Sequence, residues 1–329
     1  MRDFDYAVPR DVAGAIDTVA RAAGALFIAG GTGLVDLMKL EVQNPTTLVD
    51  VNRLPLSEIR ETEGGALRIG AMARNTAVAY HPLVRERYPL LSQAVLAGAS
   101  AQLRNMATVG GNLMQRTRCT YFRDVHEACN KRTPGSGCAA ADGYHRMHAI
   151  LGTSEHCIAT HPSDMCVALL CFDTVVEVQG SEATRRIPLE HFHVLPGDTP
   201  HLETVVRHDE LITAIEIPRP SGNRLSSYRK IRDRASYEFA LVSVAASLTT
   251  DGKTIRDARI AFGGVATKPW RAHGVEKVLN GAEPNIETWR AAAEASITGA
   301  APRRHNRFKV ELLKRTLIRT LVELTGVER

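Results

Sequence analysis

Four cysteines lie in a polar segment of the chain, where free thiols are unusual. They are Cys119, Cys129, Cys138 and Cys157, with 9, 8 and 18 residues between them, and arginines, glycines and a proline surround them. Thiolates are soft ligands, and four of them suit either zinc or an iron–sulfur cubane. Zinc ribbons and fingers favour close C-x-x-C pairs, which this segment lacks. The spacing therefore predicts a soft-metal site without deciding which metal it holds.

The two remaining cysteines, Cys166 and Cys171, have apolar neighbours. They lie in the run MCVALLCF, which has the character of a helix. A buried free cysteine behaves like a small hydrophobic residue. We therefore expect these two thiols in the core and leave them out of the metal site.

Composition predicts a soluble protein of two domains that is made in the cytoplasm. The chain has 329 residues, 44% of them apolar, and its net charge of +5 is scattered along the sequence. Aromatic residues make up only 5% of it, which argues against nucleic-acid binding. The first residues, MRDFDYAVPRDVAGAI, do not resemble a signal peptide, and no apolar run is long enough to span a membrane. In a reducing compartment the cysteines are not expected to form disulfides.

Two glycine-rich segments predict the binding of an anionic group. AGGTGLVD (29–36) follows a predicted strand, and ATVGGN (107–112) follows a helix predicted near residues 89–105. Glycine lets the backbone approach a ligand closely, and two such turns can aim N–H groups at one diphosphate. The first segment matches the dinucleotide fingerprint only in part, because Asp36 stands where a third small residue is required. A purely structural tight turn is therefore an open alternative for each segment.

The order of predicted elements is α/β at the start and antiparallel afterwards. A helix is expected over 11–23 and strands over 25–30 and 46–51, followed by strands near 174–178 and 211–217. The segment IPRPSGNR (217–224) has the composition of a linker, so we place a domain boundary there. Strands follow, and then a long amphipathic C-terminal helix. Its apolar face is predicted to carry Val310, Leu313, Leu317, Leu321 and Leu324, with Lys309, Lys314, Arg315 and Arg319 mostly on the solvent side. HPSDM (161–165) precedes an apolar run, where its Ser-Asp pair suits a helix N-cap.

These motifs together resemble those of a known family. AGGTGLVDLMK, ATVGGNLMQ, HPSDM, YRKIRDRASYEFALVSVA and FGGVATKPWR are similar to segments of the FAD-binding subunits of molybdenum hydroxylases, the group of xanthine dehydrogenase, aldehyde oxidoreductase and carbon monoxide dehydrogenase. The segments RTRC, CNKRTPGSGCAA and CIATHPSDM are most similar to the flavoprotein subunit of bacterial periplasmic aldehyde oxidoreductases. The likeness covers most of the chain.

The resemblance implies an α+β protein with two domains. Residues 1–220 would form a two-part FAD-binding domain of the p-cresol methylhydroxylase type, with an iron–sulfur loop at about 116–160. Residues 221–329 would form the smaller α+β C-terminal domain of these flavoproteins. The implied FAD ligands are Leu26, Phe27, Ile28, Ala29, Gly30, Gly31, Thr32, Gly33 and Leu34 in the first wall, Thr108, Gly111, Asn112 and Gln115 in the second, and Asp164 and Lys230 at the flavin.

The resemblance also implies a role and partners. The chain would pass electrons from 2Fe-2S clusters of one partner through FAD to an external acceptor, while a molybdenum subunit oxidises an aldehyde. It further implies a 4Fe-4S cluster on Cys119, Cys129, Cys138 and Cys157, whose basic neighbours would also attract an acidic partner. The complex would assemble in the cytoplasm or be carried to the periplasm by a partner subunit. A self-contained FAD oxidase and a zinc-binding structural protein are the alternatives.

Overall fold

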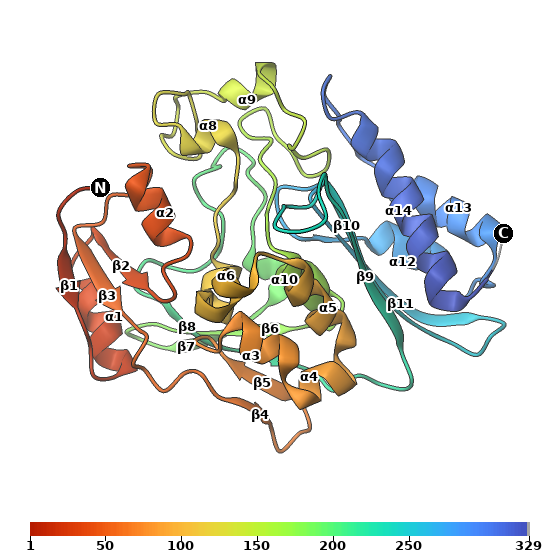
Figure 1. Cartoon of the computed structure of the whole chain (residues 1–329), viewed down its shortest axis with the longest axis horizontal. Helices are drawn as coiled ribbons and strands as arrows, with labels where there is room; N and C mark the ends of the chain where they lie inside the picture. Colours follow the sequence, from red (N-terminus) through yellow and green to blue (C-terminus); the bar gives the residue numbers. More distant parts are fainter. Residues whose placement is uncertain (328–329) are drawn as a thin grey trace.

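The amino-terminal part of the chain forms a small parallel sheet. The computed structural model describes residues 1–327 (Figure 1). Strands β1 (Asp5–Ala7), β2 (Ala25–Ile28) and β3 (Thr47–Asp50) pair in the order β1-β3-β2. Helix α1 (Val12–Ala20) packs on them through a buried apolar face, and the Asp11 carboxylate caps it by accepting the N–H of Gly14 at 2.8 Å. Helix α2 (Leu34–Lys39) follows the first glycine segment.

A five-stranded antiparallel sheet forms the second half of this domain. Its strand order is β4-β5-β8-β6-β7, and its largest apolar cluster lies between the sheet and a group of helices. The strands are β4 (Ile59–Glu61), β5 (Leu67–Gly70), β6 (Val175–Gln179), β7 (Thr184–Pro188) and β8 (Leu211–Ile217). The helices are α3 (Asn75–Tyr80), α4 (Pro82–Arg87), α5 (Pro89–Ala97), α6 (Ala101–Met106), α7 (Val109–Leu113), α10 (Asp164–Leu170) and α11 (Leu189–Phe192).

The cysteine segment links α7 to α10 and extends away from both sheets of this domain. It carries little regular structure apart from α8 (Thr120–Arg123) and α9 (Ala139–Asp142), which lie at the top of Figure 1. Turns rich in glycine and proline favour such an irregular path.

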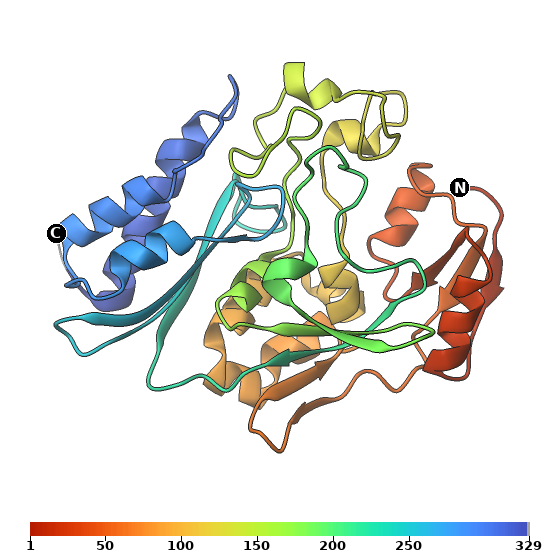
Figure 2. The same cartoon turned by 180° about the vertical axis from the view of Figure 1, so that it is seen from behind.

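The carboxy-terminal part is a four-stranded antiparallel sheet covered by helices. The strand order is β12-β11-β10-β9, and Figure 2 shows the helices on the outer face of the sheet. Helices α5 and α10 contact strands of this sheet as well, which joins the two domains. The elements are β9 (Leu225–Ile231), β10 (Val242–Thr250), β11 (Ile255–Gly263), β12 (Trp270–Arg271), α12 (His273–Leu279), α13 (Ile286–Ala295) and α14 (Phe308–Thr325).

Three features differ from the sequence-based expectation. The single helix expected near residues 89–105 is two helices, separated where Ala99 adopts a φ of 52°. The expected turn ATVGGN is the start of α7, whose N-cap Thr108 accepts the N–H of Gly111 at 3.1 Å. Lys309, expected on the solvent side of the last helix, is fully buried. Within residues 1–327, no helix combines the length and the apolar character that crossing a bilayer requires.

Candidate cofactor site

A large cavity lies where the two halves of the first domain meet the C-terminal sheet. Its volume is about 1090 Å³, at the upper end of the roughly 300–1,000 Å³ typical of small-molecule sites. All the expected FAD ligands line it except Ile28, whose neighbours on both sides do so. The structure therefore brings together four parts of the chain that are far apart in the sequence.

The glycines of the first wall have three different physical roles. A Cβ on Gly30 would lie 2.0 Å from the carbonyl oxygen of Met106, so this glycine lets the two halves of the domain touch. Gly31 has a φ of 70°, which favours glycine. A Cβ on Gly33 would meet no protein atom within 4 Å. Of these three positions, Gly33 is the one that leaves open space for a ligand.

The second wall is the capped start of α7. Thr108 is buried and its hydroxyl is used as the N-cap. The Asn112 side-chain oxygen accepts from Ser163 Oγ at 2.6 Å and from Gln115 Nε2 at 2.7 Å. These bonds fix the second wall against the start of α10, so Ser163, the N-cap of that helix, helps to shape the cavity.

A buried ion pair lies at the junction with the C-terminal sheet. Lys230 on β9 donates to Asp164 Oδ2 at 2.8 Å and to the Ala97 carbonyl oxygen at 3.2 Å, and the two side chains are 3% and 9% exposed. Tyr228 donates to the other carboxylate oxygen at 2.6 Å. Burial, reinforced by the Asp164 charge, holds the pKa of Tyr228 well above its usual value. Asp164 therefore accepts from both sides, while the lysine, with three donors, retains one N–H for a ligand.

The charges around the cavity suit an anionic ligand. Eight Lys and Arg side chains and five carboxylates line it. Arg116 and Lys131 both pair with Glu203, and Arg123 pairs with Asp36. These residues were expected to face an acidic partner, but in this part of the chain they form intramolecular pairs at the cavity wall. Their charges are therefore partly compensated within the chain, and the attraction of an acidic partner stays a prediction.

The cavity fits FAD on three independent grounds. It has the size for an extended dinucleotide, open backbone at Gly33, and an excess of positive charge for the diphosphate. The buried pair of Lys230 and Asp164 supplies a polar group where a flavin ring would need one.

Comparison with known proteins gives the same result. A family model described as the FAD binding domain in molybdopterin dehydrogenase matches residues 2–220, and the CO dehydrogenase flavoprotein C-terminal domain matches residues 226–324. The aldehyde oxidoreductase FAD-binding subunit PaoB of Escherichia coli (strain K12) is 52% identical over 325 residues, 98% of each chain. The chain belongs to the FAD-binding subunits of the molybdenum hydroxylase family.

More distant members share the fold. The carbon monoxide dehydrogenase medium chain of Hydrogenophaga pseudoflava is 27% identical over 91% of this chain and 88% of its own length. A solved structure of the carbon monoxide dehydrogenase from this organism superposes with a TM-score of 0.78 at 24% identity, covering 99% of this chain and 98% of that one. The expected α+β architecture, an FAD-binding domain followed by a smaller flavoprotein C-terminal domain, is confirmed.

The expected 4Fe-4S cofactor is wrong. The matching descriptions name FAD as the cofactor of this subunit, and the iron–sulfur clusters of the family are 2Fe-2S clusters on a partner chain. The resemblance of the motifs implied a cluster on the cysteine segment, and these findings do not support it. That the four thiols bind a metal stays a prediction.

The four thiols nevertheless lie near one another. Cys129 and Cys138 face each other across an isolated antiparallel bridge, and all six cysteines are free. Burial raises the pKa of Cys119 to about 12, and the nearby thiols of Cys129 and Cys157 reinforce the shift. Cys119 Sγ lies 3.1 Å from Nε2 of His148, whose pKa burial lowers to about 4. Without a ligand, this thiol and this imidazole are therefore both neutral.

A different trio has its potential ligand atoms close together. Within residues 1–327, His161, Cys166 and His193 are the group of three such side chains whose ligand atoms all lie within 4.8 Å of one another. Sequence reasoning had assigned Cys166 to the core only. Burial holds the pKa of His161 well below its usual value, and its Nδ1 accepts the N–H of Ser163 at 3.3 Å. In the neutral ring the proton is then on Nε2, so neither nitrogen offers a metal a free lone pair.

Sequence reasoning missed Tyr228 and His161. Both lie inside quoted motifs, YRKIRD and HPSDM: Tyr228 is two residues before Lys230, and His161 is three residues before Asp164. Side chains alternate between the two faces of a strand, so Tyr228 lies on the same face as Lys230, two residues away. This alternation could have identified Tyr228 from the sequence. Nothing in the sequence predicts the contact between His161 and His193, whose ring centroids are 4.5 Å apart.

Proposed function

We propose that this chain is the electron-transferring FAD subunit of a molybdenum-dependent aldehyde oxidoreductase. The observation that carries the proposal is the 52% identity, over 98% of both chains, with an aldehyde oxidoreductase FAD-binding subunit. Electrons would enter from a partner's 2Fe-2S clusters and leave to an external acceptor. The described residues supply a cavity with the size and charge for FAD.

The chain's partners follow from its family. Its relatives are medium chains of heterotrimeric molybdenum hydroxylases, which assemble with a molybdenum subunit and a 2Fe-2S subunit. The nicotine 6-hydroxylase medium subunit of Paenarthrobacter nicotinovorans, 28% identical over 95% of both chains, is named in the same way. We infer a heterotrimer of that composition for this chain.

Individual residues would divide the binding of FAD among them. The diphosphate would lie between Gly33 and the start of α7, where backbone N–H groups and an excess of basic side chains are available. Lys230 would donate its remaining N–H to the flavin ring, and Asp164 would hold that lysine in place. Bound FAD accepts and releases the electrons, whereas the protein supplies its position and its electrostatic surroundings.

We also propose that the boundary between the FAD-binding domain and the C-terminal domain lies between residues 220 and 221.

Co-expression with the two partner chains tests the proposal. We expect one complex on size-exclusion chromatography, with one FAD per copy of this chain and aldehyde oxidation in the complex only. The isolated chain should show flavin absorption but no aldehyde turnover. A chain that elutes alone and oxidises an aldehyde by itself would instead be a self-contained FAD oxidase, and the subunit assignment would fail.

A further inference from the structure

Helix α10 is held at both ends by the C-terminal domain. Asp164, its first residue, is bound by Tyr228 and Lys230 on β9. Leu170, its last residue, presents its carbonyl oxygen to Arg271 Nη1 on β12 at 2.7 Å. In the sheet order β12-β11-β10-β9 these are the two opposite edge strands, so the helix crosses the sheet from edge to edge.

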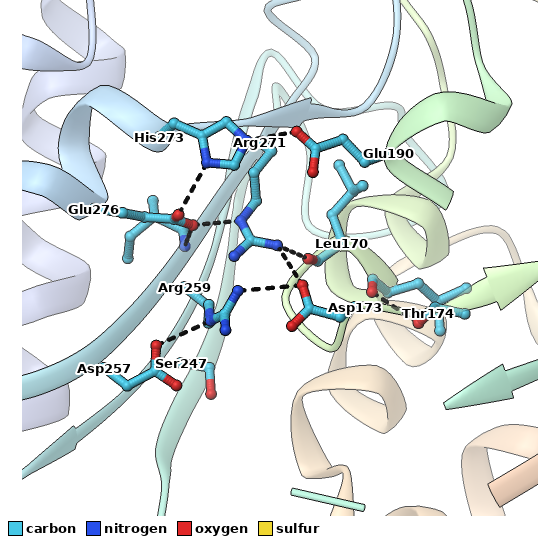
Figure 3. Close-up of polar contacts among 12 residues, drawn as sticks. Leu170, Asp173, Thr174, Glu190, Ser247, Asp257, Arg259, Arg271, His273 and Glu276 are labelled. Atoms are coloured by element: carbon cyan, nitrogen blue, oxygen red, sulfur yellow. Dashed lines mark hydrogen bonds and ion pairs between the residues drawn. The ribbon is translucent and has the colours of Figure 1, made fainter. Parts of the chain in front are cut away.

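Arg271 is built into this junction. Its side chain is 4% exposed, and besides Leu170 it donates to Asp173 Oδ1 at 3.1 Å and pairs with the Glu276 carboxylate (Figure 3). Glu276 Oε1 in turn accepts the Ile260 N–H at 2.9 Å. A guanidinium at the C-terminal end of a helix satisfies free carbonyl groups and interacts favourably with the helix dipole. The arginine thus links the end of α10 to β12, α12 and the turn after the helix.

Between its two ends α10 packs closely and without polar contacts to the sheet. Residues 165–170 are all buried. Below them, Gly263 on β11 has no side chain, and a Cβ there would lie 2.7 Å from Val167 Cγ2. This close packing sets how near α10 lies to the sheet. The directional polar contacts at the two ends add to it and fix the orientation of the terminal residues.

We propose that Arg271 is a positioning residue for the flavin site and acts through α10. By fixing the C-terminal end of the helix, it holds Asp164, about 10 Å away at a rise of about 1.5 Å per residue, in register with Lys230 and Tyr228. The inference rests on the proposed flavin contact of Asp164 and Lys230. It assigns a role in cofactor binding to a side chain that does not line the cavity.

The test measures FAD dissociation from the purified heterotrimer. Removing Arg271 alone would take the guanidinium partner from the buried Glu276 carboxylate and leave it only the contact with His273 at 3.3 Å. The comparison is therefore made in a Glu276→Gln background, where the amide oxygen can still accept the Ile260 N–H. Adding Arg271→Met should speed FAD release about tenfold, within the coupling range of residues in one network. Arg271→Lys should recover part of the loss, because an ammonium group can still donate to the Leu170 carbonyl.

Arg259 provides the matched control. It also contacts Asp173, at 3.2 Å, but makes no bond to α10 and is 32% exposed. Arg259→Met should leave the FAD release rate within about twofold of the parent. A thermal melt of each complex separates general loss of stability from a specific effect on the cofactor.

A double-mutant cycle tests whether Arg271 affects FAD binding through Asp164. If Arg271 acts through Asp164, then Arg271→Met should add nothing to FAD release once Asp164→Asn is present. Fully additive effects, or equal release rates with and without Arg271, would overturn the inference while leaving the flavin site intact. If Asp164→Asn alone leaves FAD binding unchanged, the flavin assignment of Asp164 fails, and the inference fails with it.

Discussion

The FAD cavity and the cysteine segment are both built from irregular, glycine-containing chain, yet they are organised in different ways. In the cavity, open backbone at Gly33 and one buried ion pair form the binding surface. In the cysteine segment, side-chain thiols gather beside an imidazole, and burial keeps Cys119 protonated. The cavity is prepared for an anionic ligand by its charge, whereas the cysteine segment presents the neutral thiol of Cys119.

The difference shows which kinds of motif can be transferred from one protein to another. A glycine segment constrains its own backbone, so its geometry follows from a few adjacent residues. Widely spaced cysteines do not constrain the local backbone. Which ligand they bind depends on how the long loops between them fold. The FAD expectation was supported and the 4Fe-4S expectation was contradicted, in line with that contrast.

The largest effect is expected at Gly30, where the two halves of the domain touch. Gly30→Val should abolish FAD retention and lower the thermal stability, because its Cβ would overlap the Met106 carbonyl group. Gly33→Val should reduce FAD retention but leave the melting temperature of the FAD-free protein unchanged, since the added atoms enter open space. Bound flavin and thermal melts measure the two effects. Equal melting temperatures for both variants would contradict the distinct roles given to the two glycines.

The buried ion pair should produce the next largest effect. Lys230→Met leaves Asp164 charged and unpaired, and breaking a buried pair in this way typically costs about 3–5 kcal/mol. We expect lower stability and loss of FAD. Adding Asp164→Asn should restore part of the stability but not the FAD, as urea unfolding and flavin absorbance would show. Lys253→Met, at an exposed turn, is the control. Full FAD occupancy in Lys230→Met would remove the lysine from the site.

Thiol reactivity tests whether burial keeps Cys119 protonated in the cysteine segment. With a pKa of about 12, Cys119 should react with iodoacetamide at pH 8 about a thousandfold more slowly than in the unfolded chain, because the thiolate is the reactive form. Cys166, whose pKa burial also raises to about 12, is the internal control. Mass spectrometry of the labelled protein follows both sites. Rapid labelling of Cys119 in the folded chain would mean that the thiol is ionised or accessible.

The smallest effect is expected for Lys309, a residue of α14 that donates a hydrogen bond to the cysteine segment. It donates to the carbonyl oxygens of Met147 at 3.0 Å and Gly264 at 2.7 Å, and burial lowers its pKa to about 7. The unfolded chain then holds more protons between pH 7 and 10, so this lysine should make the protein more stable as the pH rises. The slope is at most about 1.4 kcal/mol per pH unit.

Lys309→Met removes the titrating group and serves as the reference. Urea unfolding of both proteins from pH 7 to 8.5 should show the free energy of unfolding of the wild type rising relative to that of the variant. A constant difference across this range would mean that the buried ammonium does not lose its proton there.

By itself, the sequence indicated the family, most of the order of elements and the segments that line the cavity, because these follow from local patterns. The cap Asp11, the strand at 25–28 and the N-cap Ser163 all depend on near neighbours in the chain. Tertiary structure alone decided which distant groups meet. It placed Met106 against Gly30, Tyr228 against Asp164, and Arg271 at the far end of the same helix.

The burial of Lys309 shows the same division most clearly. Its place in the sequence predicts a solvated cation on an amphipathic helix, and the helix forms as expected over Phe308–Thr325. The carbonyl groups that surround the ammonium come from Met147 and Gly264, more than 40 residues away, as the 162- and 45-residue separations show. Helical periodicity sets which face a residue occupies, but the packing of distant loops decides whether that face meets water or protein.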